Sequence, residues 1–391
     1  MVYKYFNIVF NKMNRKYLIN FIILMVTILL FLLVFEFSLR IFSPQPVLIR
    51  SHIEASPTIF QEEEDIPWGL KPLVNTRHIG IFDEWNVSIK TNNFGLRDDD
   101  YTYDQNVKKI LFLGDSFTFG YGVEKDEIYV EILEDLLGKN YTFLNAGYAS
   151  GYSPDTAYVY LKEKGLDFNP KFVVLGFFIG NDIDDVGSNE WVKIDDDGLP
   201  NKIISNQFYI DNKNRLRVKG DENVIQNNPF QFFYKINIFL SYKSHLYVFL
   251  KDRLKPLFYE LLGQPISMEN SIYANVYTND TESFLVKTEK AILGIKKLLK
   301  DNGGEFIIIL IPSRDQFSKE RDYTYNFTKP NEVLLNFGKE NDLIVLDLLP
   351  HFKNEDNPLE FYYEKDPHWN SRGHEFAARK IYEELNELNV I

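Results

Sequence analysis

Two kinds of hydrophobic pattern divide the chain. Residues 17–35, YLINFIILMVTILLFLLVF, form an almost uninterrupted apolar run, whereas from residue 107 onward short apolar runs alternate with amphipathic stretches. A run of about 19 apolar residues makes roughly 28 Å of helix at about 1.5 Å per residue, enough to cross the hydrocarbon core of a bilayer. The first pattern therefore predicts a transmembrane anchor over residues 17–36, and the second predicts alternating strands and helices.

The short apolar runs after residue 107 have the length of buried strands. They read KKILFLGD, YTFLNAG, KFVVLGFFIGND, EFIIILIP and DLIVLDL. Helix-length segments separate them, for example SPDTAYVYLKEKG, with Ser153 as the expected cap, Pro154 at the first position and Gly165 at the end. Strands that alternate with helices and are apolar on both faces predict an α/β fold with a parallel sheet covered on both sides. Such sheets bind ligands at the carboxyl ends of their strands.

The remaining segments complete the predicted domain organisation. WNVSIKTNNFGLRDDD suggests a strand followed by a turn at residues 92–95, and the aromatic stretch at 228–263 predicts a helix, either packed on the core or serving as a lid or membrane-resting helix. The predicted boundaries are a cytoplasmic N-terminus over 1–16, the anchor over 17–36, an extracytoplasmic lead-in over 37–105, and a domain over 106–391 with an insertion at about 186–280.

Charge sets the expected orientation of the anchor. Lys4, Lys12, Arg15 and Lys16 precede the apolar run, and the positive-inside rule then places residues 1–16 in the cytoplasm and the rest of the chain outside. A cleaved signal peptide and a buried helix are the alternatives. A signal peptide has a shorter apolar core of about 7–15 residues and a small-residue cleavage site, and the exit sequence EFSLRIFSPQP is a poor one.

The amino-acid composition argues against several kinds of partner and reaction. The formal net charge of -13 argues against a nucleic-acid partner. The chain has no cysteine, which excludes disulfides, thiolate catalysis and cysteine-ligated metals. We expect no cofactor and no metal.

Four segments with polar or glycine residues follow predicted strands or precede the last helix. They contain Ser116, Gly147, Asn181 and, in EKDPHWNSRGH, Asp366 and His368. Each has an ordinary structural alternative: Ser116 as a helix cap, Asn181 in a loop turn, and Asp-Pro-His as a helix entry. Together they match an acyl-transfer site, because His368 is a natural base for Ser116. Pro367 favours extended backbone at Asp366, which puts the Asp366 and His368 side chains on one side. The Ser116 and Gly147 N–H groups and the Asn181 amide are the expected oxyanion donors.

These blocks resemble the four motif blocks of the SGNH hydrolase superfamily, also called GDSL esterases and lipases. The resemblance covers roughly residues 91–185 and 282–391 and implies a three-layer α/β/α, flavodoxin-like fold with about five parallel strands. It also implies Ser116 as nucleophile. The stretch TNNFGLRD is similar to a lead-in of many bacterial members. In the family two residues usually separate the acid from the histidine, whereas here only Pro367 does, and Lys365 occupies the usual acid position.

Other site types fit the sequence less well. A Gly-x-Ser-x-Gly nucleophile turn needs glycine where Thr118 stands, and a P-loop needs lysine where Tyr121 stands. Asp366, His368 and His374 have poor spacing for a metal. Asp115 and Arg314 are candidate substrate-binding residues, Asp115 with a structural hydrogen-bonding role as its alternative.

The sequence thus predicts a membrane-anchored extracytoplasmic serine esterase or O-acyltransferase. Its expected substrates are acyl, above all acetyl, esters of a cell-envelope glycan. The alternatives are a lipase-like or lysophospholipase-like esterase with the aromatic insertion as a lid, and a non-catalytic glycan-binding envelope protein. The acyl chain, the acceptor and the oligomeric state stay open.

Overall fold

The computed structural model describes most of the chain in separate ranges. These are residues 15–43, 58–80, 84–100, 107–138, 140–148, 151–219, 240, 243–261, 271–317 and 325–388. Most of the predicted cytoplasmic segment, residues 1–14, lies outside the described residues, as do 220–239 and 262–270 of the predicted insertion. The chain divides into two compact units, Met1–Arg50 with Ile225–Ser267 and Ser51–Val224 with Met268–Ile391.

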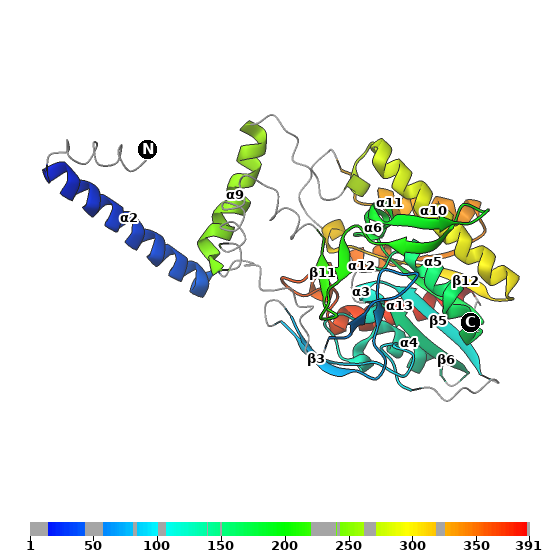
Figure 1. Ribbon diagram of the computed structural model, residues 1–391. Coiled ribbons are helices and arrows are strands. Elements are labelled where there is room, and N and C mark those ends of the chain that lie inside the picture. Colours follow the sequence, from blue (N-terminus) through cyan, green and yellow to red (C-terminus); the bar gives the residue numbers. More distant parts are fainter. Residues whose placement is uncertain are drawn as a thin grey trace. The chain divides into compact units, whose positions relative to one another are not determined.

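A five-stranded parallel sheet is the centre of the larger unit (Figure 1). Its strands are β5 (Lys108–Gly114), β6 (Tyr141–Gly147), β7 (Phe172–Phe178), β12 (Glu305–Ile311) and β13 (Ile344–Asp347). The order across the sheet is β13-β12-β7-β5-β6, with every neighbouring pair parallel. The predicted parallel sheet of about five strands is confirmed. Because the chain places β6 on one side of β5 and β7 on the other, the strand order reverses beside β5, where such sheets bind ligands.

Alternate residues of β5 enter two different cores, one on each face of the sheet. Leu111 and Leu113 pack in a cluster with apolar residues of α5, α10 and α11, whereas Ile110 and Phe112 pack with residues of α4, α12 and α13. The helices are α4 (Tyr129–Leu137), α5 (Pro154–Glu163), α10 (Asn279–Asp301), α11 (Lys329–Glu340), α12 (Leu349–Lys353) and α13 (Ser371–Leu388). Helices on both faces make the three-layer α/β/α architecture that the sequence predicts.

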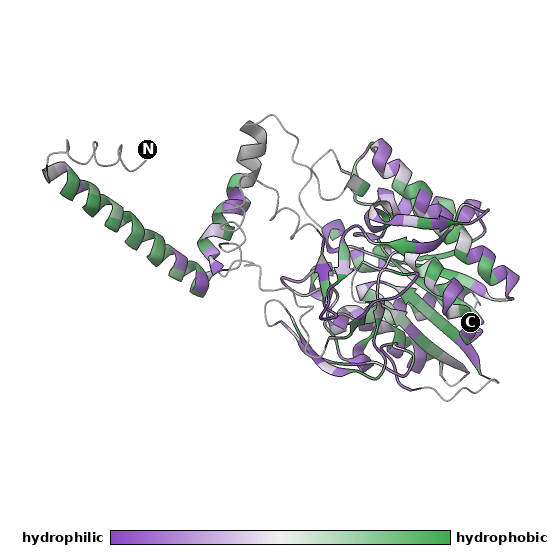
Figure 2. Ribbon diagram, in the orientation of Figure 1, coloured by the Kyte–Doolittle hydropathy of each residue, from purple (hydrophilic) through white to green (hydrophobic). Residues whose placement is uncertain are grey.

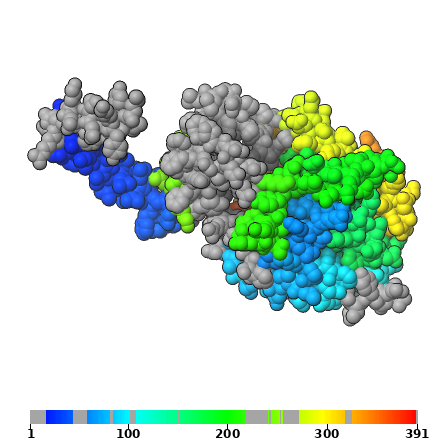
Figure 3. Space-filling view, viewed as in Figure 1, coloured from blue at the N-terminus to red at the C-terminus, as the bar shows by residue number. Residues whose placement is uncertain are grey.

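The lead-in and the insertion of the larger unit form small antiparallel hairpins. Their strands are β1 (Phe60–Gln61), β2 (Gly69–Leu70), β3 (Asn75–Ile79), β4 (Asn86–Lys90), β8 (Glu190–Ile194), β9 (Pro200–Ile204), β10 (Phe208–Ile210) and β11 (Leu216–Val218). The predicted strand before the turn at 92–95 is β4. The two parts contact one another, since the Ile203 N–H donates to the Asp65 carbonyl at 2.9 Å and Trp68 packs edge-on against Phe208. On the face seen in Figure 3, the green insertion runs beside the blue lead-in.

The smaller unit holds α2 (Arg15–Phe42) and α9 (His245–Leu261). Figure 2 shows α2 as hydrophobic along most of its length, and Tyr17–Phe42 is long and apolar enough to cross a membrane. The helix continues beyond the predicted boundary at residue 36. Near its end the Glu36 carboxylate accepts hydrogen bonds from the Ser244 hydroxyl (2.8 Å) and from the N–H groups of His245 (3.1 Å) and Leu246 (2.8 Å), which caps α9. The helix predicted in the aromatic stretch is therefore present, and it groups with α2.

Candidate active site

Ser116 is the first residue of α3 (Ser116–Phe119), two residues after the end of β5. The residue that caps this helix is Asp115, whose side chain accepts a hydrogen bond from the Phe117 N–H at 3.0 Å. The alternative interpretation of Ser116 as the cap is therefore wrong by one position, because aspartate meets the same need for an acceptor at a helix start. The Ser116 hydroxyl is left to make another contact.

That contact is with His368. The Ser116 Oγ lies 2.7 Å from Nε2 of His368, and Nδ1 of the same ring lies 2.5 Å from Oδ1 of Asp366. The backbone N–H of His368 also donates to Asp366 Oδ1, at 2.9 Å. One carboxylate oxygen thus accepts from both the ring and the backbone of a residue two positions later. This pair of hydrogen bonds is how the short Asp-Pro-His spacing still joins the acid to the imidazole.

The three residues sit at a partly covered edge of the sheet. Ser116 is 8% exposed and Asp366 is 4% exposed, while the His368 side chain keeps 19% of its surface in solvent. Aromatic rings flank the imidazole: the ring centroid of Tyr121 lies 4.6 Å away and that of Phe117 lies 5.1 Å away. The imidazole is thus the most exposed of the three side chains.

Three glycines carry α3 directly on the sheet. Gly114 is paired in register with Gly147 on β6 and with Gly176 on β7. A Cβ atom at Gly114 or Gly176 would lie 2.3–2.4 Å from the Thr118 hydroxyl, and one at Gly147 would lie 2.3 Å from the backbone nitrogen of Phe119. No larger residue fits at these positions without moving the helix. The glycines therefore determine how close α3, and with it Ser116, lies to the sheet.

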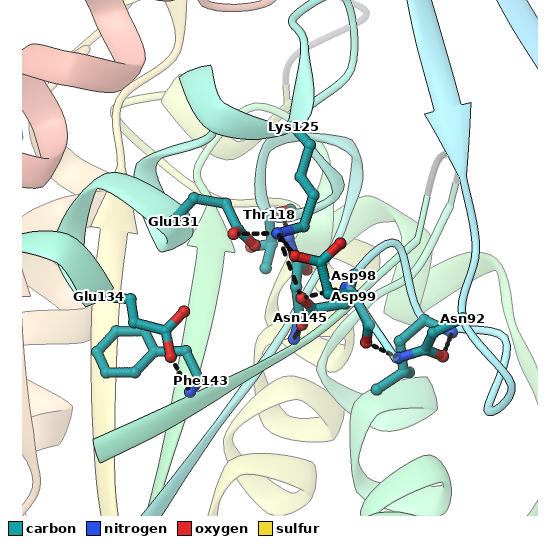
Figure 4. A network of polar contacts seen from close by, with 10 residues as sticks. Asn92, Asp98, Asp99, Thr118, Lys125, Glu131, Glu134, Phe143 and Asn145 are labelled. Atoms are coloured by element: carbon teal, nitrogen blue, oxygen red, sulfur yellow. Dashed lines mark hydrogen bonds and ion pairs between the residues drawn. The ribbon is translucent and has the colours of Figure 1, made fainter. Parts of the chain in front are cut away.

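Gly147 has a second function that differs from the predicted one. Its N–H donates to Oδ1 of Asn145 at 3.0 Å, so this expected oxyanion donor is already hydrogen-bonded. The Asn145 amide in turn donates to the Thr118 carbonyl at 2.9 Å, and Asp98 accepts from the Asn145 N–H at 3.0 Å (Figure 4). The glycine belongs to a network that holds α3 on β6.

Gly147→Ala should separate these two roles, because alanine keeps the N–H but adds a Cβ. We expect the free energy of unfolding to fall by about 1–3 kcal/mol, as for other overpacked sites. Thermal denaturation of the variant measures this effect, with Gly304→Ala as control, since a Cβ there meets nothing closer than 3.1 Å. Unfolding unchanged from the wild type would contradict the close packing of α3 on Gly147.

Asn181 lies at the end of the neighbouring strand. It precedes α6 (Asp182–Ser188) as its cap residue, but its side chain makes no capping hydrogen bond. The next residue, Asp182, is buried and accepts from the Phe178 N–H at 3.0 Å, which fixes the turn after β7. The side-chain amide of Asn181 is thus not used by the helix start.

Burial raises the pKa of Asp182 and raises the pKa of Asp115 to about 6.

The remaining candidate residues are Asp115, Arg314 and His374. Asp115 is only 1% exposed and caps α3, so its position favours the structural role over contact with substrate. Arg314 begins the short helix η4 (Arg314–Phe317) after β12, and among the described residues it makes no hydrogen bond or ion pair with Ser116, Asp366 or His368. His374 is buried on α13, and its Nδ1 accepts from the Tyr129 N–H at 3.3 Å.

Sequence reasoning did not single out Arg97 as a support of the nucleophile segment. This arginine is 1% exposed, its guanidinium lies over the Phe119 ring, and it donates to the carbonyls of Phe119, Gly120 and Val123. It therefore holds the turn that follows α3. Figure 4 shows the ion pairs of the neighbouring chain segment, in which Lys125 contacts Asp98, Asp99 and Glu131. The only sequence signal was its place in TNNFGLRD.

One family model matches the chain. It is described as the SGNH hydrolase-like domain of acetyltransferase AlgX, and it covers residues 273–390. The matched part includes β12, β13 and the loop with Asp366 and His368, whereas Ser116 and Asn181 precede it. No curated protein matches the sequence.

Solved structures of similar proteins include three with related descriptions. A putative acylhydrolase from Bacteroides fragilis is 12% identical over 74% of this chain and 91% of its own, with a TM-score of 0.37. A lipase/acylhydrolase from Enterococcus faecalis is 15% identical over 72% and 97%, with a TM-score of 0.37. An acetyl xylan esterase is 14% identical over 71% and 99%, with a TM-score of 0.37.

The architecture and the family match together define the class of domain. A five-stranded parallel sheet between two helix layers, with polar residues after the strand ends, is an α/β/α fold of the kind that binds ligands at the carboxyl ends of its strands. More narrowly, residues 273–390 match the model of an SGNH hydrolase-like domain, which confirms the predicted resemblance to that superfamily over this part of the chain.

Proposed function

We propose that this protein is a membrane-anchored, extracytoplasmic serine esterase or O-acyltransferase that acts on acetyl esters of a cell-envelope glycan. The observation that carries the proposal is the hydrogen-bonded series from Ser116 through His368 to Asp366. A serine, a base within hydrogen-bond reach and a third group that orients the base are what acyl transfer requires. The match to a family described by an acetyltransferase supports the acetyl group.

In the first half of the reaction, Ser116 Oγ attacks the carbonyl carbon while its proton passes to Nε2 of His368. The carbonyl oxygen becomes an oxyanion, for which the Asn181 amide and the Ser116 N–H are the donors in this proposal. The bond to the leaving alcohol then breaks, and the alcohol takes the proton from His368. Asp366 holds the ring by Nδ1 throughout and stabilises the imidazolium. The product is an acyl-Ser116 ester.

In the second half, His368 removes a proton from water or from a sugar hydroxyl. The resulting attack on the acyl-enzyme breaks the bond to Ser116 Oγ, which recovers the proton from His368. Water yields a carboxylic acid, and the enzyme is then an esterase. A sugar hydroxyl yields a new ester, and it is then a transferase. The helix α2 supports a location at the membrane, where envelope glycans supply sugar hydroxyls and the solvent supplies water.

The deciding experiment measures turnover of p-nitrophenyl acetate by the full chain in detergent, with and without neutral oligosaccharide acceptors. We expect hydrolysis of the acetyl ester, and acetylated oligosaccharide in the mass spectrum if the enzyme transfers. A strong preference for octanoate over acetate would favour the lipase-like alternative. A protein that binds oligosaccharide but neither turns over esters nor reacts with a fluorophosphonate would refute the proposal and favour a glycan-binding role.

A further inference from the structure

Glu84, in the lead-in, contacts the loop that carries the triad acid. Its Oε1 accepts a hydrogen bond from the Lys365 N–H at 3.0 Å, and its Oε2 accepts from the Asp366 N–H, also at 3.0 Å. One carboxylate thus binds two successive backbone N–H groups, using both of its oxygens. Hydrogen bonds to an ionised acceptor are about twice as strong as bonds between neutral groups.

The loop that Glu84 binds has little regular structure of its own. A bridge between Tyr362 and Trp369 closes it, and the Tyr363 N–H donates to the His368 carbonyl at 3.1 Å. Residues 363–368 between these points belong to no helix or strand. Pro367 has no N–H to donate, and the two residues before it, Lys365 and Asp366, both have one. Glu84 takes both of them.

The residue after Glu84 supports the same site from another side. Trp85 is 6% exposed and packs edge-on against Tyr121, with 5.0 Å between ring centroids. Tyr121 in turn lies 4.6 Å from the His368 ring. The two neighbouring residues therefore contact the acid's backbone and the ring that covers the base. No other part of the lead-in reaches both members of this pair among the described contacts.

We propose that Glu84 is a positioning residue that sets the distance between Asp366 and His368. The inference rests on the proposed function, because it assigns Glu84 a task in the same triad. The acid stands one residue closer to the histidine than in the family pattern, on a loop without regular structure. The two hydrogen bonds that the Lys365 and Asp366 N–H groups donate to Glu84 hold the Asp366 backbone where the Asp366 Oδ1 meets Nδ1 of His368.

The test compares Glu84→Ala and Glu84→Gln with the wild-type full chain in detergent. For Glu84→Ala we expect kcat for p-nitrophenyl acetate to fall about 10- to 100-fold while KM changes less than about threefold, because misplacing a catalytic group by an ångström costs rate rather than affinity. Glu84→Gln keeps one acceptor oxygen and presents an NH₂ group to the second N–H. We expect its loss to be smaller, about three- to tenfold.

Glu364 supplies the matched control. It lies on the same loop and is exposed, so Glu364→Ala and Glu364→Gln make the same charge changes without touching the two N–H groups. We expect both controls to keep kcat within about twofold. If Glu84→Ala loses no more activity than Glu364→Ala, the positioning role is refuted.

A second readout works even if the enzyme has no esterase activity. A proton shared between Nδ1 of His368 and Asp366 gives a low-field resonance in the proton NMR spectrum. We expect this resonance in the wild type and in Glu364→Ala, and its loss or broadening in Glu84→Ala at unchanged thermal stability. A resonance that persists in Glu84→Ala overturns the inference and leaves the proposed function standing. If Glu84→Ala loses the resonance but the wild type has no esterase activity, only the proposed function is refuted.

Discussion

Replacing Ser116 by alanine should abolish both ester hydrolysis and labelling by a fluorophosphonate probe. The Ser116 hydroxyl is the group 2.7 Å from Nε2 of His368, and alanine leaves that base with nothing to activate. Removal of a triad nucleophile costs on the order of 10⁶ in turnover in the best-studied case, and we expect a loss of at least about 10⁴ here. Ser116 is also the first residue of α3, not its cap, so its loss should leave helix stability nearly unchanged.

Labelling is the more direct of the two measurements, because the probe reacts covalently with the activated serine. It can be used without knowing the substrate of the enzyme. Ser371→Ala is a suitable control, since it removes a hydroxyl at the first residue of α13 outside the triad. We expect this control to label like the wild type and to hydrolyse p-nitrophenyl acetate at a similar rate. Full labelling of Ser116→Ala would show that another residue is the nucleophile.

The sheet was predictable because each of its strands is a continuous apolar run. A strand such as β5 must be apolar on both faces when helices cover both, and Ile110 to Leu113 meet that condition. The order of the strands was not predictable from these runs. Hydrophobicity says that a strand is buried, but not which strand lies beside it. That β5 sits between β6 and β7 follows from packing of the whole chain.

The site residues were predictable where the reaction requires a particular type of side chain. They were not predictable where the role of a residue depends on backbone geometry. Ser116 and His368 come together as their types suggest. The contrast is Gly147, whose sequence context suggests a free N–H but whose N–H is taken by Asn145 two residues earlier. A side chain that turns back onto its own strand leaves no signal in a pattern of residue types. The same limit explains why Asp115 rather than Ser116 caps α3.

Contacts between irregular segments were the least predictable. Glu84 and Lys365 are 281 positions apart and neither lies in a helix or strand. The periodicity of apolar residues indicates which side chains of a helix or strand are buried, but it says nothing about loops. Nothing in the sequence therefore connects a glutamate in the lead-in to a backbone N–H in the last loop. Arg97 is similar, since its partners are carbonyl oxygens, which every residue has.

The second large effect is expected for Asp366→Asn. The substituted side chain would present either its amide oxygen or its NH₂ group to Nδ1 of His368, and the NH₂ group would favour the tautomer that carries its proton on Nε2. That nitrogen could then no longer accept the proton of Ser116. The corresponding change in a serine protease lowers kcat by about 10⁴, and we expect a loss on the order of 10³–10⁴ here. The rate of p-nitrophenyl acetate hydrolysis and the rate of fluorophosphonate labelling should fall together.

Position 365 provides the decisive comparison, because the family pattern places the acid there and this chain has an exposed lysine. Adding Lys365→Asp to Asp366→Asn moves the carboxylate from position 366 to position 365. The double variant carries one more negative charge than the wild type. We expect no rescue, since Asp366 is 4% exposed and reaches Nδ1 directly, whereas position 365 lies on the outside of the loop with its N–H bound to Glu84. Recovery to within about tenfold of the wild type would mean that the loop rearranges to the usual spacing. In that case the pair of hydrogen bonds from His368 to Asp366 is not what holds the base in place.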